Sequence, residues 1–87
     1  MSEPKVFADF HNADVQGRVR LNCIGTMRDL ASQKILLREG LPLRLYSEDL
    51  EADGVVQFSS EEKIWVAAID WNLIEQKGDS LAAKRPF

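Results

Sequence analysis

The chain of 87 residues has the length of one domain, and its composition, 45% hydrophobic and 29% charged, is typical of a globular fold. Its one cysteine and one histidine exclude an internal disulfide and any metal site built from several cysteines or histidines. No apolar run approaches the length of a signal peptide or of a membrane span, roughly 20 residues, so we expect a soluble cytoplasmic protein without membrane insertion.

The net charge of −3 is spread unevenly along the chain. Residues 16–46 hold six basic and two acidic residues (+4), whereas residues 47–79 hold nine acidic and two basic residues (−7). In a small domain the two halves lie against each other, so the asymmetry indicates internal pairing of charges. A dipolar surface used for docking is the alternative.

The segment 5–11 (KVFADFH) alternates in a way that predicts a strand. One side of it carries Val6, Ala8 and Phe10. Asp9 and His11 share the other side, and a carboxylate beside an imidazole is half of a catalytic triad. Solvation or local pairing at a strand end is the preferred explanation of the two residues, and we expect no catalysis there.

The segment 18–24 (RVRLNCI) follows turn residues 12–17 and alternates again, so it predicts a half-buried strand. Its inward side carries Val19, Leu21 and Cys23. Its outward side carries Arg18, Arg20 and Asn22. An inward free cysteine usually acts as a small hydrophobic residue, so the sequence predicts a structural role for Cys23. With no nucleophile identified, we do not expect the chain to be an enzyme.

Gly25 ends this strand, and residues 26–33 (TMRDLASQ) predict one or two helical turns. Thr26 is a possible N-cap, with Asp29 three positions later, close to the pattern of a capping box. The helix would place three apolar residues on one face: Met27, Leu30 and Ala31. An extended conformation of this short segment remains open.

The segment 41–49 (LPLRLYSED) predicts another strand, with the leucines on one side and Arg44 and Tyr46 on the other. Pro42 donates no backbone hydrogen bond and therefore belongs at the strand's start or on an edge. We expect residues 47–54 (SEDLEADG) to form an acidic solvated loop, without the residue order of a calcium-binding loop.

Two strands, 55–59 and 64–70, flank the polar loop 60–63 and predict a hairpin. Residues 70–74 (DWNLI) predict a short 3₁₀ or α turn capped by Asp70. The remainder, 75–87, has the composition of a flexible tail.

These elements predict a mainly β domain over residues 5–74, preceded by a short lead, 1–4. The best match is a small SH3-like barrel of five to six short antiparallel strands with one short helix or 3₁₀ turn. An OB-like barrel is the alternative, although it would place a longer helix between its third and fourth strands.

The string GLPLRLYSEDLEADGVVQFSSEEKIWVAAID resembles the C-terminal strands of small SH3-like barrels. There, a glycine opens a strand, an acidic loop follows, a second glycine opens a hairpin, and a tryptophan-bearing strand ends in a short turn. Together, the pieces DFHN, GRVRLNCIGT, LREGL, LYSEDLE and WVAAIDW are similar to uncharacterised small conserved proteins of cyanobacterial type. This resemblance implies a barrel and brings no activity, cofactor or site residue.

We expect a non-enzymatic protein-interaction or accessory-subunit module, because outward arginines and aromatic residues are enriched at protein interfaces. The candidate partner-binding residues are Arg18, Arg20, Arg44, Tyr46 and Trp71. If the two strands that carry Arg18, Arg20, Arg44 and Tyr46 are neighbours, these four residues form a small basic-aromatic patch, which keeps RNA or single-stranded nucleic-acid binding as the alternative. We expect no cofactor, no metal, and a monomer or a homodimer.

The two tryptophans have different expected roles. Trp65 lies within a strand whose two faces are both apolar, so the sequence predicts that it belongs to the core. Trp71 follows Asp70 in the capping turn. It would either plug one end of the barrel or stand partly exposed as an anchor for a partner.

Overall fold

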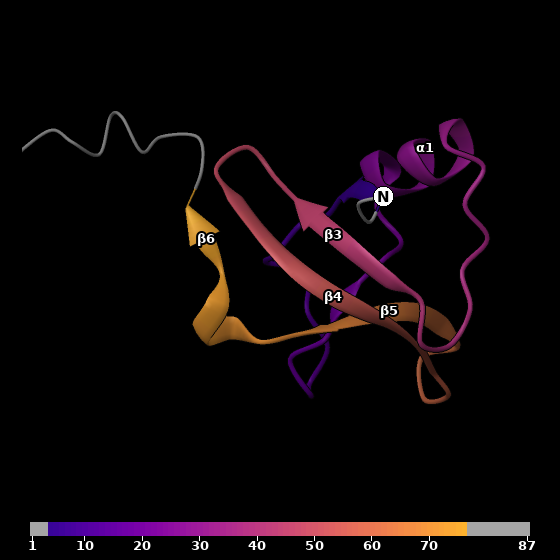
Figure 1. Ribbon diagram of the computed structural model, residues 1–87. Coiled ribbons are helices and arrows are strands. Elements are labelled where there is room, and N and C mark those ends of the chain that lie inside the picture. Colours follow the sequence, from indigo (N-terminus) through magenta and orange to yellow (C-terminus); the bar gives the residue numbers. More distant parts are fainter. Residues whose placement is uncertain (1–3, 77–87) are drawn as a thin grey trace, which may run out of the picture.

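The computed structural model describes residues 4–76 and shows one curled sheet that forms half of a barrel (Figure 1). Its elements, in chain order, are β1 (Lys5–Phe7), β2 (Val19–Arg20), α1 (Ile24–Ser32), β3 (Pro42–Tyr46), β4 (Leu50–Ser59), β5 (Ile64–Ile69), the 3₁₀ turn η1 (Trp71–Leu73) and β6 (Glu75–Gln76). The strand order is β1-β3-β4-β5-β2, and β6 pairs with the start of β4. The predicted mainly β class, with one short helix and one 3₁₀ turn, is confirmed.

One strand pair differs from the prediction of an antiparallel barrel. β1 runs parallel to β3, with Val6 opposite Leu45, whereas the other strand pairs are antiparallel. The connection between β1 and β3 contains both β2 and α1, and such a long crossover allows a parallel pairing.

The core fills the concave side of the sheet, and the predicted inward faces of the strands supply it. Its buried apolar side chains are Val6, Ala8, Phe10, Val19, Leu21, Leu30, Leu43, Leu45, Ala52, Val56 and Ala67. The alternation of residues along β1, β2 and β3 therefore predicted correctly which of their side chains face the core. Cys23 is only half-buried, at the start of α1, and is a free cysteine.

The predicted acidic loop 47–54 is wrong over most of its length, because β4 already begins at Leu50. Ala52 is buried in the core, while Glu51 and Asp53 lie on the outer face, where both pair with Arg44 of β3. A basic residue on the neighbouring strand thus lets an acidic segment continue as a strand. Only residues 47–49 connect the two strands.

The predicted helix exists, but it begins two residues early and Thr26 is not its N-cap. α1 starts after Cys23, and Gly25 lies inside it rather than at the end of a strand. Thr26 is fully buried in the first turn, and its hydroxyl donates a 2.6 Å hydrogen bond to the carbonyl of Phe7. The hydroxyl therefore connects α1 to β1 instead of capping the helix.

Polar side chains of α1 close the free edge of β1. Besides Thr26, Gln33 Nε2 donates to the Lys5 carbonyl at 2.7 Å, and Asp29 Oδ2 accepts the Phe7 N–H at 2.8 Å. These residues are spaced three and four apart, so they share one face of the helix and its C-cap. An edge strand with its backbone groups satisfied in this way offers no template for a further strand.

Residues 55–74 follow the prediction. The β4–β5 hairpin is confirmed, with Ser59 opposite Ile64 across the loop 60–63. Asp70 caps η1, since its Oδ1 accepts the Asn72 N–H at 3.0 Å. Two residues of the predicted tail 75–87 form β6, and residues 77–87 lie outside the described residues, as do residues 1–3 of the lead.

Candidate interaction surface

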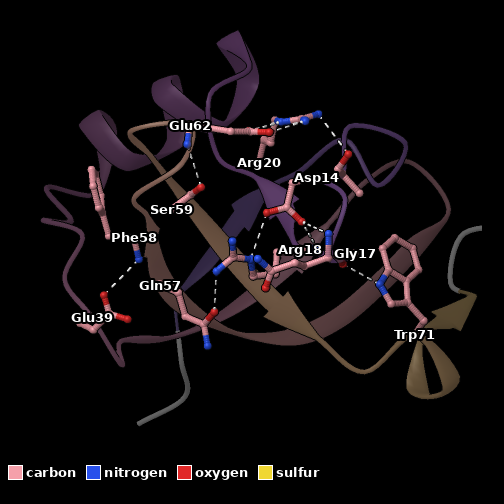
Figure 2. Close-up of polar contacts among 12 residues, drawn as sticks. Asp14, Gly17, Arg18, Arg20, Glu39, Gln57, Phe58, Ser59, Glu62 and Trp71 are labelled. Atoms are coloured by element: carbon pink, nitrogen blue, oxygen red, sulfur yellow. Dashed lines mark hydrogen bonds and ion pairs between the residues drawn. The ribbon is translucent and has the colours of Figure 1, made fainter.

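Arg18 and Arg20, two of the three arginines predicted to face a partner, are each held by polar groups of this chain (Figure 2). Arg18 Nε lies 3.0 Å from Asp14 Oδ2, and its Nη1 donates to Gln57 Oε1 at 3.1 Å. Arg20 donates two parallel hydrogen bonds, of 2.7 and 2.8 Å, to the two oxygens of Glu62. Such a bidentate pair fixes the guanidinium in orientation as well as in position.

These contacts change the proton affinities of the groups. The hydrogen bonds between Arg20 and Glu62 raise the pKa of the arginine and lower that of the carboxyl group. Burial alone would raise the pKa of Asp14, but backbone N–H donors from Arg18 and Gln16, together with the Arg18 side chain, outweigh it and lower that pKa. The carboxyl groups of Asp14 and Glu62 are therefore ionised at neutral pH.

Arg44 is surrounded by three acids on the outer face of β3 and β4. Its guanidinium lies 3.2 Å from Glu51, 3.0 Å from Asp53 and 2.7 Å from Glu75. Hydrogen bonds to Asp53 and Glu51 raise the pKa of Arg44 despite partial burial. Lys5 adds a further ion pair, 2.7 Å from Glu51. The positive charge of Arg44 is thus more than offset locally.

Tyr46 is half-buried, and its hydroxyl donates a 2.6 Å hydrogen bond to Asp29 Oδ2. This hydrogen bond, together with burial, raises the pKa of Tyr46. The Tyr46 ring also packs edge to face against Phe7, with 5.8 Å between ring centroids. Its phenol group therefore ties β3 to α1.

The predicted basic-aromatic patch depends on β2 and β3 being neighbours, and they are not. In the sheet, β4 and β5 lie between them. The structure thus brings Arg18 together with Arg20, and Arg44 together with Tyr46, but it does not join the two pairs through adjacent strands.

Trp71 is held by the fold and is also partly exposed. Its ring packs edge to face against buried Phe10, and its indole Nε1 donates to the Gly17 carbonyl at 2.7 Å (Figure 2). The residue nevertheless keeps 44% of its surface exposed. Trp65 is half-buried against the core, as expected, and its ring meets that of Phe58 at 5.1 Å.

The Asp9–His11 pair lies at an exposed turn. The His11 side chain is 97% exposed, and its Nδ1 lies 3.7 Å from Asp9, which accepts the His11 backbone N–H instead. The two residues border a hollow of about 220 Å³ opposite residues 47–50. Cys23 does not line this hollow, and its Sγ lies 3.0 Å from the Thr26 hydroxyl.

An open apolar hollow of about 560 Å³ lies between α1 and the segment that follows it. Its lining residues are Met27, Leu30, Ala31, Lys34, Ile35 and Leu36. Leu36 is 86% exposed and Met27 56% exposed, and Ile24, one helical turn before Met27, is 74% exposed. We term the six lining residues together with Ile24 the α1 surface.

The sequence analysis did not identify this surface, because it assigned the apolar residues of the helix to one packed face. Only Leu30 of that face is buried. α1 faces β1 largely through Thr26 and Asp29, so Met27 and Ala31 are left toward solvent. The run Ile35–Leu36–Leu37 could have indicated an exposed apolar side chain, because the side chains of three consecutive residues point in different directions and cannot all face one core.

Within residues 4–76, no group of three or more histidine, cysteine, aspartate or glutamate residues is arranged to hold a metal ion. No helix in the same range has the length and apolar character needed to cross a membrane. Comparisons of the chain with protein-family models, with curated proteins and with solved structures found no match.

Proposed function

We propose that this chain is a non-enzymatic protein-interaction or accessory-subunit module. The SH3-like class of its barrel, its similarity to small conserved proteins of cyanobacterial type and its cytoplasmic location belong to the same proposal. The observation that carries it is the α1 surface, where Ile24, Met27 and Leu36 each expose more than half of their area. Clustered exposed apolar side chains are characteristic of protein-binding sites.

The shape of the α1 surface supports a role in binding. Isolated exposed apolar residues are ordinary on protein surfaces, but here they surround a hollow of about 560 Å³. A hollow of this kind accepts apolar side chains from a partner, and such buried anchors dominate the free energy of association.

The positions of the reactive side chains support a non-enzymatic role. His11 is almost wholly exposed, and no hydrogen bond of the described residues joins it to Cys23, whose Sγ lies 3.0 Å from the Thr26 hydroxyl. Nucleophilic catalysis needs the base within hydrogen-bond reach of the nucleophile.

The alternative, RNA or single-stranded nucleic-acid binding, gains no support from the arginines on which it was based. Arg18, Arg20 and Arg44 each lie against at least one acid of this chain. Phosphate binding needs a net positive potential at the contact face, and these pairs reduce it.

Photo-crosslinking in the native cell tests the proposal on the full chain. A photoreactive benzoylphenylalanine replaces Met27 on the α1 surface or, as the control, exposed Glu61 in the loop between β4 and β5. We expect discrete protein adducts from position 27 and none of the same adducts from position 61. Failure of position 27 to give any discrete adduct would contradict the proposal. An adduct with a second copy of the chain would identify the homodimer as the partner.

A further inference from the structure

The basic side chains of the described residues fall into two groups. Lys5, Arg18, Arg20 and Arg44 each form an ion pair with an acid of this chain. Among residues 4–76, four basic side chains have no such pair: Arg28, Lys34, Arg38 and Lys63. Within the described residues, the positive charge that remains available to a partner is therefore limited to these four positions.

One of these cations belongs to the α1 surface, and a second borders it. Lys34 lines the hollow, and Arg28 lies on α1 at spacings of four and three from Ile24 and Ala31, so it neighbours both on the helix surface. Arg38 follows two residues after Leu36 and is also exposed. Three of the four available cations thus lie in one short segment, 28–38.

The acids of the same part of the chain are already engaged. The Asp29 carboxylate accepts hydrogen bonds from Phe7 N–H and the Tyr46 hydroxyl. Glu39 accepts the Phe58 N–H at 3.0 Å (Figure 2). These neutral donors leave both carboxylates charged, so residues 28–39 carry three cations and two acids, a net charge of +1, whereas the whole chain carries −3. Because the Asp29 carboxylate faces Phe7 and Tyr46, Arg28 and Lys34 give the apolar α1 surface a positively charged border.

We infer that the α1 surface binds an acidic amphipathic peptide segment of a partner protein, whose apolar side chains enter the hollow while its carboxylates face Arg28 and Lys34. This inference rests on the proposed function and specifies its partner. Apolar anchors supply most of the affinity in such a complex, and the charges set the orientation and the association rate.

The geometry favours a peptide over a membrane or a nucleic acid. An apolar concavity accepts a protruding side chain, whereas a membrane surface offers none. The residues that line the hollow include no aromatic ring on which a base could stack. A helix with apolar residues at i, i+3, i+4 and i+7 fits a groove beside another helix.

Selection of displayed random peptides against the full chain tests the partner's chemistry. Peptides of about 16 residues are long enough to carry anchors at i, i+3, i+4 and i+7. We expect the enriched peptides to be negatively charged and amphipathic, and to perturb the amide NMR signals of Met27, Ala31 and Leu36. Enriched peptides that are neutral or basic, or that perturb other residues, would overturn this inference and leave the proposed function standing.

Lys34→Glu and Lys63→Glu form a matched pair of variants. Both lysines are exposed, both lack an ion pair within residues 4–76, and their backbones are nearly the same, with φ of 57° and 59°. We expect Lys34→Glu to weaken binding of the selected peptide about five-fold and Lys63→Glu to change it by less than about two-fold. Equal effects would show that only the net charge matters, and would overturn the inference.

Two further outcomes decide between the inference and the proposed function, or reject both. Enrichment of no peptide at all, together with no crosslink from position 27, would overturn both. Binding of vesicles that contain phosphatidylglycerol, abolished by Met27→Glu and not competed by any selected peptide, would replace the peptide with a membrane surface and overturn the inference.

Discussion

Tyr46 and Asp29 share a 2.6 Å hydrogen bond that ties strand β3 to helix α1. The accepting oxygen, Asp29 Oδ2, also accepts the backbone N–H of Phe7, so one carboxylate oxygen connects the helix to two strands. The tyrosine predicted to meet a partner is therefore a structural element of the fold. Its phenol group provides a spectroscopic probe, because the chain contains no other tyrosine.

The ionisation of Tyr46 should occur at higher pH in the folded chain than in the unfolded chain. The hydrogen bond to Asp29 raises its pKa, so the group stabilises the fold fully below the unfolded pKa of about 10, and this contribution is lost as pH rises through the folded pKa. Phenolate absorbance should show the delayed titration. Asp29→Asn should move the midpoint toward that of free tyrosine, and an unchanged midpoint in this variant would contradict the assigned cause.

Asp14 should make the stability of the chain sensitive to acid. Its pKa is lowered by hydrogen bonds from Arg18 and Gln16, which outweigh burial, so its contribution is present above the unfolded pKa of about 4 and is lost as pH falls through the folded pKa. Asp14→Asn should lower the free energy of unfolding by about 1–2 kcal/mol at neutral pH. Urea denaturation should show that this difference shrinks toward pH 2 (about two units below that unfolded pKa).

A matched control for this effect is Asp49→Asn, which removes an exposed acid from the loop 47–49. It should leave the unfolding free energy nearly unchanged at neutral pH, as surface substitutions usually do. A difference between Asp14→Asn and wild type that stays constant across the acid range would refute the role of the Asp14 charge.

The sequence predicted those features that each segment determines by itself. Alternation in the segments around Val6, Val19 and Leu43 assigned the core, because a strand's period of two decides which side chains share a face. Two predictions failed where the deciding partner lay elsewhere in the chain. The segment 50–54 forms a strand because its acids, Glu51 and Asp53, pair with Arg44 on the neighbouring strand. Thr26 is buried because its hydroxyl donates a hydrogen bond to the Phe7 carbonyl.

The candidate surface was predictable only in part, for the same reason. The alternation of residues along the strands correctly predicted that Arg18, Arg20 and Arg44 face outward. It gives no information about the acids that lie beside them in the fold. The strand order that separates β2 from β3 depends on long-range pairing. By contrast, the exposure of Leu36 follows from local crowding of three apolar residues, and could have been inferred from the sequence.

Gly25→Ala should destabilise the chain although glycine is the poorer helix former. Alanine is favoured over glycine by about 1 kcal/mol in a helix interior and by less at Gly25, the second residue of α1. A Cβ at this position of α1 would, however, lie 2.6 Å from Phe7 Cδ2, and the Phe7 ring also packs edge to face against Tyr46. We expect a net loss of about 1–2 kcal/mol in urea denaturation.

The Phe7→Ala background provides the control for this close contact. Without the ring, the helix propensity of alanine should dominate, and Gly25→Ala should then stabilise the chain relative to Phe7→Ala alone. If Gly25→Ala destabilises both backgrounds equally, contact with Phe7 is not the reason for the glycine.

The two tryptophans should differ in their contribution to stability. Trp65 packs against the core and Phe58, so Trp65→Ala should lower the unfolding free energy by about 3 kcal/mol. Trp71→Phe should retain the contact with Phe10 but lose the hydrogen bond to Gly17, at a cost of about 1 kcal/mol. A Trp65→Ala variant that melts within a degree or two of wild type would show that Trp65 lies outside the core.

A charge exchange between Arg20 and Glu62 separates a structural role of Arg20 from a role in binding. Arg20→Glu alone places two acids together where a bidentate ion pair stood, so it should lower the melting temperature. Adding Glu62→Arg should restore much of that loss, because the pair is reformed in the opposite direction. If binding of the crosslinked partner is also restored, Arg20 acts through the fold. If stability returns while binding stays lost, Arg20 contacts the partner, as the sequence predicted.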